Sequence, residues 1–155
     1  MKWLSLLPAF FVLSVTLAGA ASHQHPESAP AVPAGDYVGS DTCIACHDDS
    51  SKTLEPTAHQ KLFANKEPSK NGCEACHGPG SKHVDGNGDT EKIFRFAGSP
   101  TTAVQSQCGA CHTSLGKAHG HQKVNCLSCH SVHHASEPKS LLVKLPPDLC
   151  TSCHH

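Results

Sequence analysis

The chain has 155 residues, only 5% of them aromatic, and its 12 Lys and Arg residues nearly balance its 13 Asp and Glu residues. Because there is no excess of basic residues, a nucleic acid is not an expected partner. A short chain with so few large apolar side chains is poorly equipped to build a core of its own. Another group is therefore expected to supply much of the buried surface.

The N-terminus has the pattern of a cleaved signal peptide. A basic residue precedes an apolar run over residues 4–17, and small residues follow. The run is shorter than a membrane-spanning helix needs, which disfavours the alternative of a retained anchor. We predict a signal peptide at residues 1–20, a flexible Ala- and Pro-rich leader at 21–36 and one continuous domain at 37–155.

Five copies of the motif Cys-x-x-Cys-His use all ten cysteines of the chain. In this motif the two thiols can form thioether bonds to one haem, and the adjacent His can bind its iron. The copies are Cys43/Cys46/His47, Cys73/Cys76/His77, Cys108/Cys111/His112, Cys126/Cys129/His130 and Cys150/Cys153/His154. They predict five haem c groups, attached through the ten cysteines, with the five motif histidines as proximal iron ligands.

Three other interpretations of paired cysteines explain less of this pattern. A thioredoxin-like site needs one reactive pair, zinc ribbons join pairs into four-ligand sites, and disulfides require no fixed spacing. None of them accounts for a His after every pair. Because bacterial haem c attachment follows export, the motifs and the signal peptide together predict a periplasmic protein.

The expected fold is that of a multihaem cytochrome c, mostly irregular with short α-helices, little or no β structure, and a core formed by packed haems. Apolar spacing favours short helices within residues 50–65 and 99–114. No segment alternates long enough to predict a strand, and clusters of Gly and Pro mark turns.

Each haem iron has a second axial position, for which the chain offers only histidine. Cleavage after residue 20 would remove the only methionine, so His/Met ligation is not expected. Seven histidines outside the motifs lie in the predicted domain, enough for bis-histidine ligation at all five irons. The expected distal ligands are His59, His83, His119 and His133, with His134 or His121 as a possible fifth.

The proximal and distal ligands lie on opposite faces of a haem, which restricts the pairing. His133 closely follows His130, and His83 closely follows His77, so each is expected to bind the haem of another motif. The fifth distal position stays open between His134 and His121. Otherwise one iron is five-coordinate, and thus open to a substrate, or is ligated by a partner chain.

Three segments of the chain resemble a known family. They are Tyr37-Val38-Gly39-Ser40, Cys76-His77-Gly78-Pro79-Gly80-Ser81 followed by His83, and Cys129-His130-Ser131-Val132-His133. In these segments the chain is similar to one pentahaem half of the periplasmic decahaem cytochromes of outer-membrane porin–cytochrome conduits. It is also similar to the pentahaem electron donor of periplasmic nitrite reductase. The resemblance covers residues 37–155 and implies closely spaced bis-histidine haems of low potential.

The resemblance and the ligand inventory predict an electron carrier and not an enzyme. The expected donor is a quinol-linked membrane cytochrome, and the expected acceptor is a terminal reductase or an outer-membrane conduit. No nucleic acid and no direct membrane insertion after signal cleavage are expected. The alternative is a small haem reductase acting on nitrite or a sulfur oxyanion at one five-coordinate iron, although Arg95 is the only arginine available to orient an anion.

Overall fold

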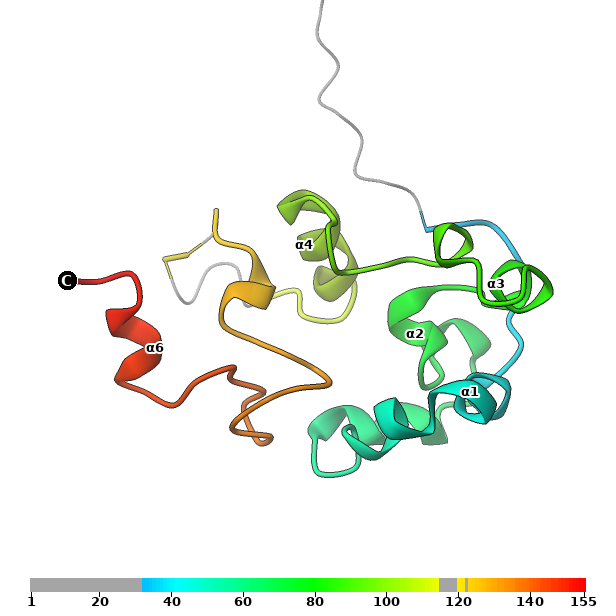
Figure 1. The fold of residues 1–155 in the computed structure, drawn as a ribbon, viewed down its shortest axis with the longest axis horizontal. Coiled ribbons are helices and arrows are strands. Elements are labelled where there is room, and N and C mark those ends of the chain that lie inside the picture. Colours follow the sequence, from blue (N-terminus) through cyan, green and yellow to red (C-terminus); the bar gives the residue numbers. More distant parts are fainter. Residues whose placement is uncertain (1–31, 115–119, 122) are drawn as a thin grey trace, which may run out of the picture.

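The computed structural model describes residues 32–114, 120–121 and 123–155 (Figure 1). The predicted signal peptide, most of the predicted leader and His119 lie outside this range. The α-helices are α1 (Ser40–Lys52), α2 (Glu74–His77), α3 (Ser81–Asp85), α4 (Thr101–Gly109) and α6 (Asp148–Thr151). The 3-10 helices are η1 (Ala58–Ala64), η2 (Pro68–Lys70), η3 (Thr90–Lys92) and η4 (Cys126–Ser128).

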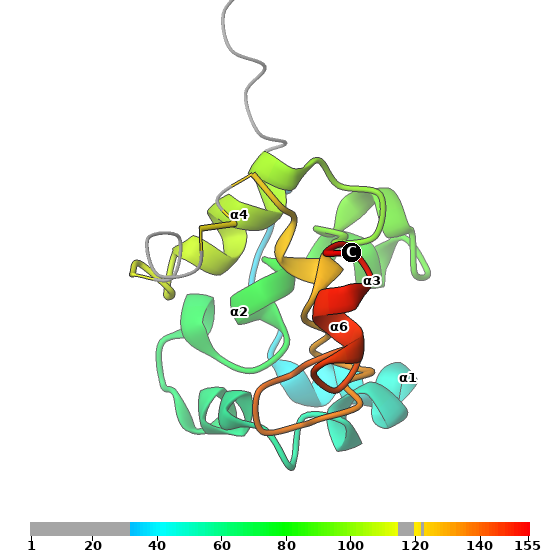
Figure 2. The ribbon, with the colours of Figure 1, turned by 90° about the vertical axis from the view of Figure 1, so that its left-hand side faces the viewer.

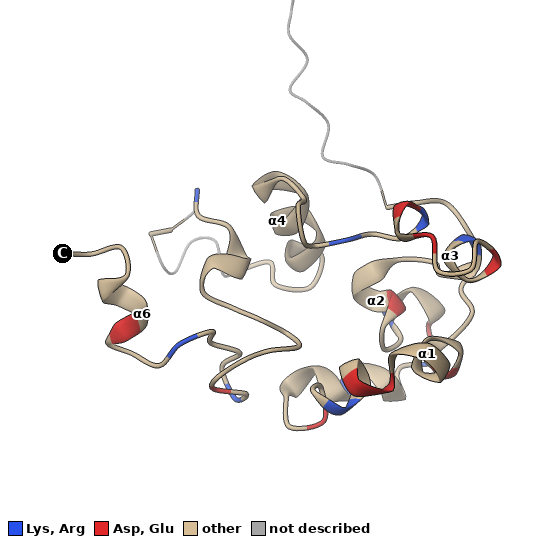
Figure 3. Ribbon diagram, viewed as in Figure 1, with Lys and Arg blue, Asp and Glu red and all other residues tan. Residues whose placement is uncertain are grey.

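The described helices are spread along the long axis of the molecule. In Figure 1, α1, α2 and α3 lie at one end, α4 lies near the middle and α6 lies at the other end. The view turned by 90° shows α6 projecting toward the viewer from the other helices (Figure 2). Charged residues are concentrated along the ribbon around α1, α2 and α3, and are sparser toward α6 (Figure 3).

The predicted fold class of short helices with little or no β structure is confirmed. In the described part of the chain, β pairing is limited to two isolated bridges, His130 with Leu142 and Glu137 with Leu142. The shortest helices have only three or four residues, too few to be stable without tertiary support. Their order must therefore come from what surrounds them.

All five motifs fall on a helical turn. The first lies within α1, which is kinked at His47, and the others lie in or beside α2, α4, η4 and α6. In motifs two to five the amide of the motif His donates to the carbonyl of the first Cys, at 2.9–3.1 Å. This i to i−4 bond brings both thiols and the imidazole to one turn, so one small group can be held at three points.

The prediction of a short helix within residues 50–65 was only partly right. The structure ends α1 at Lys52, continues through turns, and begins η1 at Ala58. Pro56 interrupts the segment because it lacks an amide hydrogen and disfavours helical geometry in the residue before it. Thr57 then caps η1 by accepting a hydrogen bond from the amide of His59.

The side-chain core is small and lies in the first part of the described chain. Its buried apolar residues are Leu54, Phe94, Ala103 and Val104, and its buried polar residues are Ser40, Thr57 and Glu74. Beyond Val104, no residue that the structure describes is buried. None of the described helices is long and apolar enough to cross a membrane.

Candidate haem-binding site

Thiols of the first and second motifs lie beside one another, as do thiols of the third and fourth. Cys43 of the first motif forms a hydrogen bond with Cys73 of the second, which raises the pKa of Cys43 and lowers that of Cys73 to about 6. Burial raises the pKa of Cys108 in the third motif to about 11, and neighbouring Cys126 of the fourth motif adds to the shift. None of the ten cysteines forms a disulfide, so all of them remain available for thioether bonds.

Four imidazole pairs recur with nearly the same separation. Each joins one motif histidine to one histidine outside the motifs, with ring centroids 5.9–6.4 Å apart. The pairs are His47 with His83, His77 with His133, His112 with His59, and His154 with His121. The ring planes are nearly parallel in the first two pairs, at 24° and 26°, and more nearly perpendicular in the other two, at 85° and 68°.

This separation fits two imidazoles on opposite sides of one metal ion. A bond from a first-row metal ion to an imidazole nitrogen is about 2 Å long, and the ring centroid lies roughly 1 Å beyond the nitrogen, so two such ligands in line place their centroids about 6 Å apart. In the described residues, no three His, Cys, Asp or Glu side chains form a group that could hold a metal ion by themselves. An imidazole pair together with the two thiols of a motif therefore fits a haem c.

Comparisons with known proteins agree with this donor set. Residues 119–155 match the family model described as a doubled CXXCH motif. The chain is also 34% identical over 134 residues to the protein named multiheme cytochrome MtrA from Shewanella baltica (strain OS185). The chain is a multihaem c-type cytochrome. It resembles the MtrA type, as its sequence predicted.

The match to MtrA covers 77% of this cytochrome but 39% of the relative. The chain thus spans about two fifths of the length of the curated relative that it matches. No solved structure matches it.

Several imidazoles of the cytochrome are oriented by backbone carbonyl groups. The Nδ1–H groups of His77, His83 and His130 donate to the carbonyls of Phe94, Asp89 and Ser140, at 2.9–3.0 Å. A carbonyl oxygen only accepts, so each proton must reside on Nδ1 and Nε2 keeps a free lone pair. This tautomer is the one that binds a metal ion through Nε2.

His133 is oriented in the same way by the helix of the first motif. Its Nδ1 lies 3.2 Å from the carbonyl of Ser50 and 3.1 Å from Oγ1 of Thr53. Burial lowers its pKa, and the proximity of His77 lowers it further, which favours the neutral, metal-binding form.

His59 differs from these residues. Its Nδ1 is buried and has no hydrogen-bond partner among the residues that the structure describes. Burial and the neighbouring His112 both lower its pKa. Both effects favour the neutral ring, and no carbonyl among the described residues orients it.

The predicted distal ligands fall into two groups in the structure. His59, His83 and His133 each lie next to a motif histidine, as does His121. The ring of His134 lies 6.5 Å from that of His133, and among the described residues it makes no ring contact with a motif histidine. His119 lies outside the described residues.

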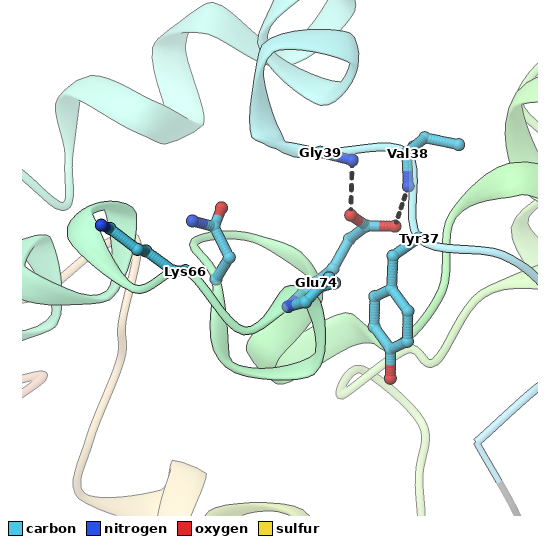
Figure 4. A pocket seen from close by; sticks show the side chains of 7 residues that line it. Tyr37, Val38, Gly39, Lys66 and Glu74 are labelled. Atoms are coloured by element: carbon cyan, nitrogen blue, oxygen red, sulfur yellow. Dashed lines mark hydrogen bonds between the residues drawn. The ribbon is translucent and has the colours of Figure 1, made fainter.

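Sequence reasoning missed Glu74, which lies between the two cysteines of the second motif. Its side chain is 3% exposed and lines a pocket with Tyr37, Val38 and Lys66 (Figure 4). The variable positions of Cys-x-x-Cys-His have no role in haem attachment, so the motif by itself predicts no function for Glu74. The sequence does contain one indication of the contact between Glu74 and Gly80. An acidic residue stands inside the motif, and the Gly-Pro-Gly turn at 78–80 follows it closely.

Proposed function

We propose that this cytochrome is a periplasmic electron-transfer protein that carries five haem c groups. The observation that carries the proposal is the set of four imidazole pairs, each made of one motif and one non-motif histidine. An iron held between two histidines has no open position for a substrate, so the role that remains to it is the transfer of electrons.

The assignment of ligands follows from the pairs. We assign His83, His133, His59 and His121 as distal ligands to the haems of motifs one, two, three and five. His119 is then the remaining candidate for the haem of the fourth motif. Each bound haem would supply a one-electron couple at low potential, because no methionine ligand is available.

The chain's own residues have three tasks in this function. The cysteines hold each group covalently, the histidine pairs close the axial positions, and the Nδ1 hydrogen bonds keep the imidazole rings in place. None of these tasks requires a side chain to move or to exchange a proton. This is the pattern expected of a carrier that must accept and release electrons quickly.

We further propose that the haems form a row in motif order. Motif thiols are neighbours between motifs one and two and between three and four, and Cys111 of motif three raises the pKa of Cys76 in motif two, although burial is the larger cause. The elements that carry motifs one and five lie at opposite ends of the molecule (Figure 1). Electrons would therefore enter at one end and leave at the other.

The donor and acceptor are proposed from the resemblance. A quinol-linked membrane cytochrome would reduce the protein, and a terminal reductase or an outer-membrane conduit would oxidise it. The export pattern at the N-terminus and the chemistry of haem c attachment support a periplasmic location.

Electron paramagnetic resonance of the fully oxidised protein tests the proposal, with the haem count taken from the mass of the intact chain. We expect five haems, all low-spin. The variant His59→Ala should add a high-spin signal from one haem, while His155→Ala should leave the spectrum unchanged as a matched control. A spectrum unaffected by His59→Ala would overturn the assignment of distal ligands.

One observation favours the alternative of a small reductase. His130 has no histidine ring partner among the residues that the structure describes, which singles out its haem as the one to examine. If the wild-type protein shows a high-spin signal and reduces nitrite or a sulfur oxyanion, the reductase is correct. If instead the wild type is entirely low-spin and His119→Ala creates a high-spin signal, the fourth haem is a closed electron-transfer centre.

A further inference from the structure

The carboxylate of Glu74 binds two separate segments of the chain, one at Val38 and Gly39 and one at Gly80. Oε1 accepts hydrogen bonds from the amides of Val38, at 3.0 Å, and Gly80, at 2.8 Å, and Oε2 accepts one from the amide of Gly39, at 2.8 Å. Figure 4 shows the carboxylate facing Val38 and Gly39 across the pocket. Three charge-assisted bonds on one buried group form a strong local clamp.

These two segments lead into the helices that present the first imidazole pair. Gly39 is the N-cap of α1, which contains His47, and Gly80 is the N-cap of α3, which contains His83. The rings of His47 and His83 lie 6.3 Å apart. Glu74 thus holds the beginnings of both helices that carry these two imidazoles.

The surrounding chain leaves little freedom for this arrangement to shift. A Cβ atom at Gly80 would lie 3.2 Å from Oε1 of Glu74 and 3.3 Å from the side chain of Val38. Gly78, between α2 and Gly80, has a φ of +74°, a conformation that only glycine adopts without strain. The close approach of the backbone to the carboxylate thus depends on glycine at both positions.

The charge of Glu74 is also unusual in its surroundings. The side chain is 3% exposed, and none of the ion pairs found in the described residues includes it. Three amide donors satisfy its oxygen atoms but do not neutralise its net charge. A negative charge shielded so little by solvent favours the more positive, oxidised state of any nearby redox centre.

We propose that Glu74 is a positioning residue for the haem of the first motif, and that its charge lowers the reduction potential of the haems bound to motifs one and two. The inference rests on the proposed function in one respect, the assignment of His47 and His83 as an axial pair. It predicts that a residue with no role in haem attachment controls both the geometry and the potential at one end of the row.

Three variants separate the two effects. Glu74→Gln removes the charge and turns one acceptor into a donor that faces backbone amides. Glu74→Asp keeps the charge but shortens the side chain, so the contacts with Val38, Gly39 and Gly80 cannot all be kept. Glu91→Gln removes one charge from an exposed side chain and serves as the control for net charge.

The measurements are the haem count by mass, the redox titration of all haems, and the low-spin resonance signals of the oxidised protein. Glu74→Gln should keep five haems and make one or two of them easier to reduce by about tenfold in equilibrium constant, which is about 59 mV for one electron. It should also shift the low-spin signal of the first haem. Glu74→Asp should shift that signal with a smaller change in potential, and Glu91→Gln should change neither.

A fourth variant, His83→Met, identifies the signal of the first haem by converting it to His/Met ligation. If His83→Met leaves every bis-histidine signal in place, the axial assignment is wrong, and the role given to Glu74 fails with it. If His83→Met acts as expected but Glu74→Gln and Glu74→Asp both match the wild type, the proposed function stands and the proposal for Glu74 is overturned. Should Glu74→Gln fail to accumulate, Glu74→Asp alone decides the positioning role.

Discussion

Residues 32–104 and residues 120–155 achieve order by different means. Every buried side chain in the described chain belongs to the first region, where Val104 is completely buried and Leu54 and Phe94 are nearly so. The second region contains two of the five motifs and no buried residue among those described. The comparison teaches that a haem motif does not need a protein core beside it in order to have a defined backbone.

In the second region, hydrogen bonds take the place of burial. The amide of Ser131 donates to the carbonyl of Leu141, and the amide of Val143 donates to the carbonyl of Cys129, at 2.8 and 3.0 Å. These bonds close a loop that also contains His133. Exposed hydrogen bonds stabilise a fold only weakly, so bound haem is expected to provide most of the stability here.

The two regions meet through specific contacts. His133 reaches back to Ser50 and Thr53 at the end of α1. In addition, Nε2 of Gln105, which lies in α4 directly after the first region, donates to the carbonyl of Val124 at 3.4 Å. The second region is thus attached to the first by a candidate iron ligand and by a side chain of α4.

The largest effect, on protection from hydrogen exchange, should follow from removing one haem, either from the second region or from the first. With Cys150→Ala and Cys153→Ala together, we expect the mass to fall by one haem and residues 145–155 to lose protection from hydrogen exchange. The matched double variant Cys43→Ala and Cys46→Ala should also lose one haem, yet leave protection around Val104 largely intact because that segment has its own core. Equal loss of protection in both variants would contradict the claim that the first region depends less on its haems than the second.

A smaller effect, on the free energy of unfolding, should distinguish the same Val→Ala substitution made in the first region and in the second. Val104→Ala removes buried methyl groups and should lower the free energy of unfolding of the holoprotein by about 1–3 kcal/mol. Val124 is 40% exposed, so Val124→Ala should change it by less than about 0.5 kcal/mol. Thermal or denaturant unfolding followed by circular dichroism would measure both, and similar losses would contradict the placement of the core.

The smallest effect should appear where the regions meet. Thr53→Val removes one of the two oxygen acceptors near Nδ1 of His133, which makes the imidazole a weaker electron donor to its iron. We expect one haem to become easier to reduce, by less than tenfold in equilibrium constant or about 59 mV. Thr53→Ser keeps the hydroxyl and should restore the wild-type potential in a redox titration.

Much of the haem chemistry could be read without a structure, because it is encoded in short local patterns. The motifs place two thiols and an imidazole on one helical turn whatever the rest of the chain does. Pro56, by contrast, shows that local patterns mislead when a single residue interrupts them, since the helix expected within 50–65 ends before it.

The sequence by itself determined the type of cofactor, predicted the residues that attach it, and showed that the predicted domain contains no methionine. These follow from spacing over five residues and from composition. Only the tertiary structure decided that His83 lies beside His47, that His121 and not His134 lies beside a motif histidine, and that Glu74 joins the segments of the first two motifs. Such pairings depend on contacts between residues far apart in the chain, and no local pattern encodes which distant segment a side chain will meet.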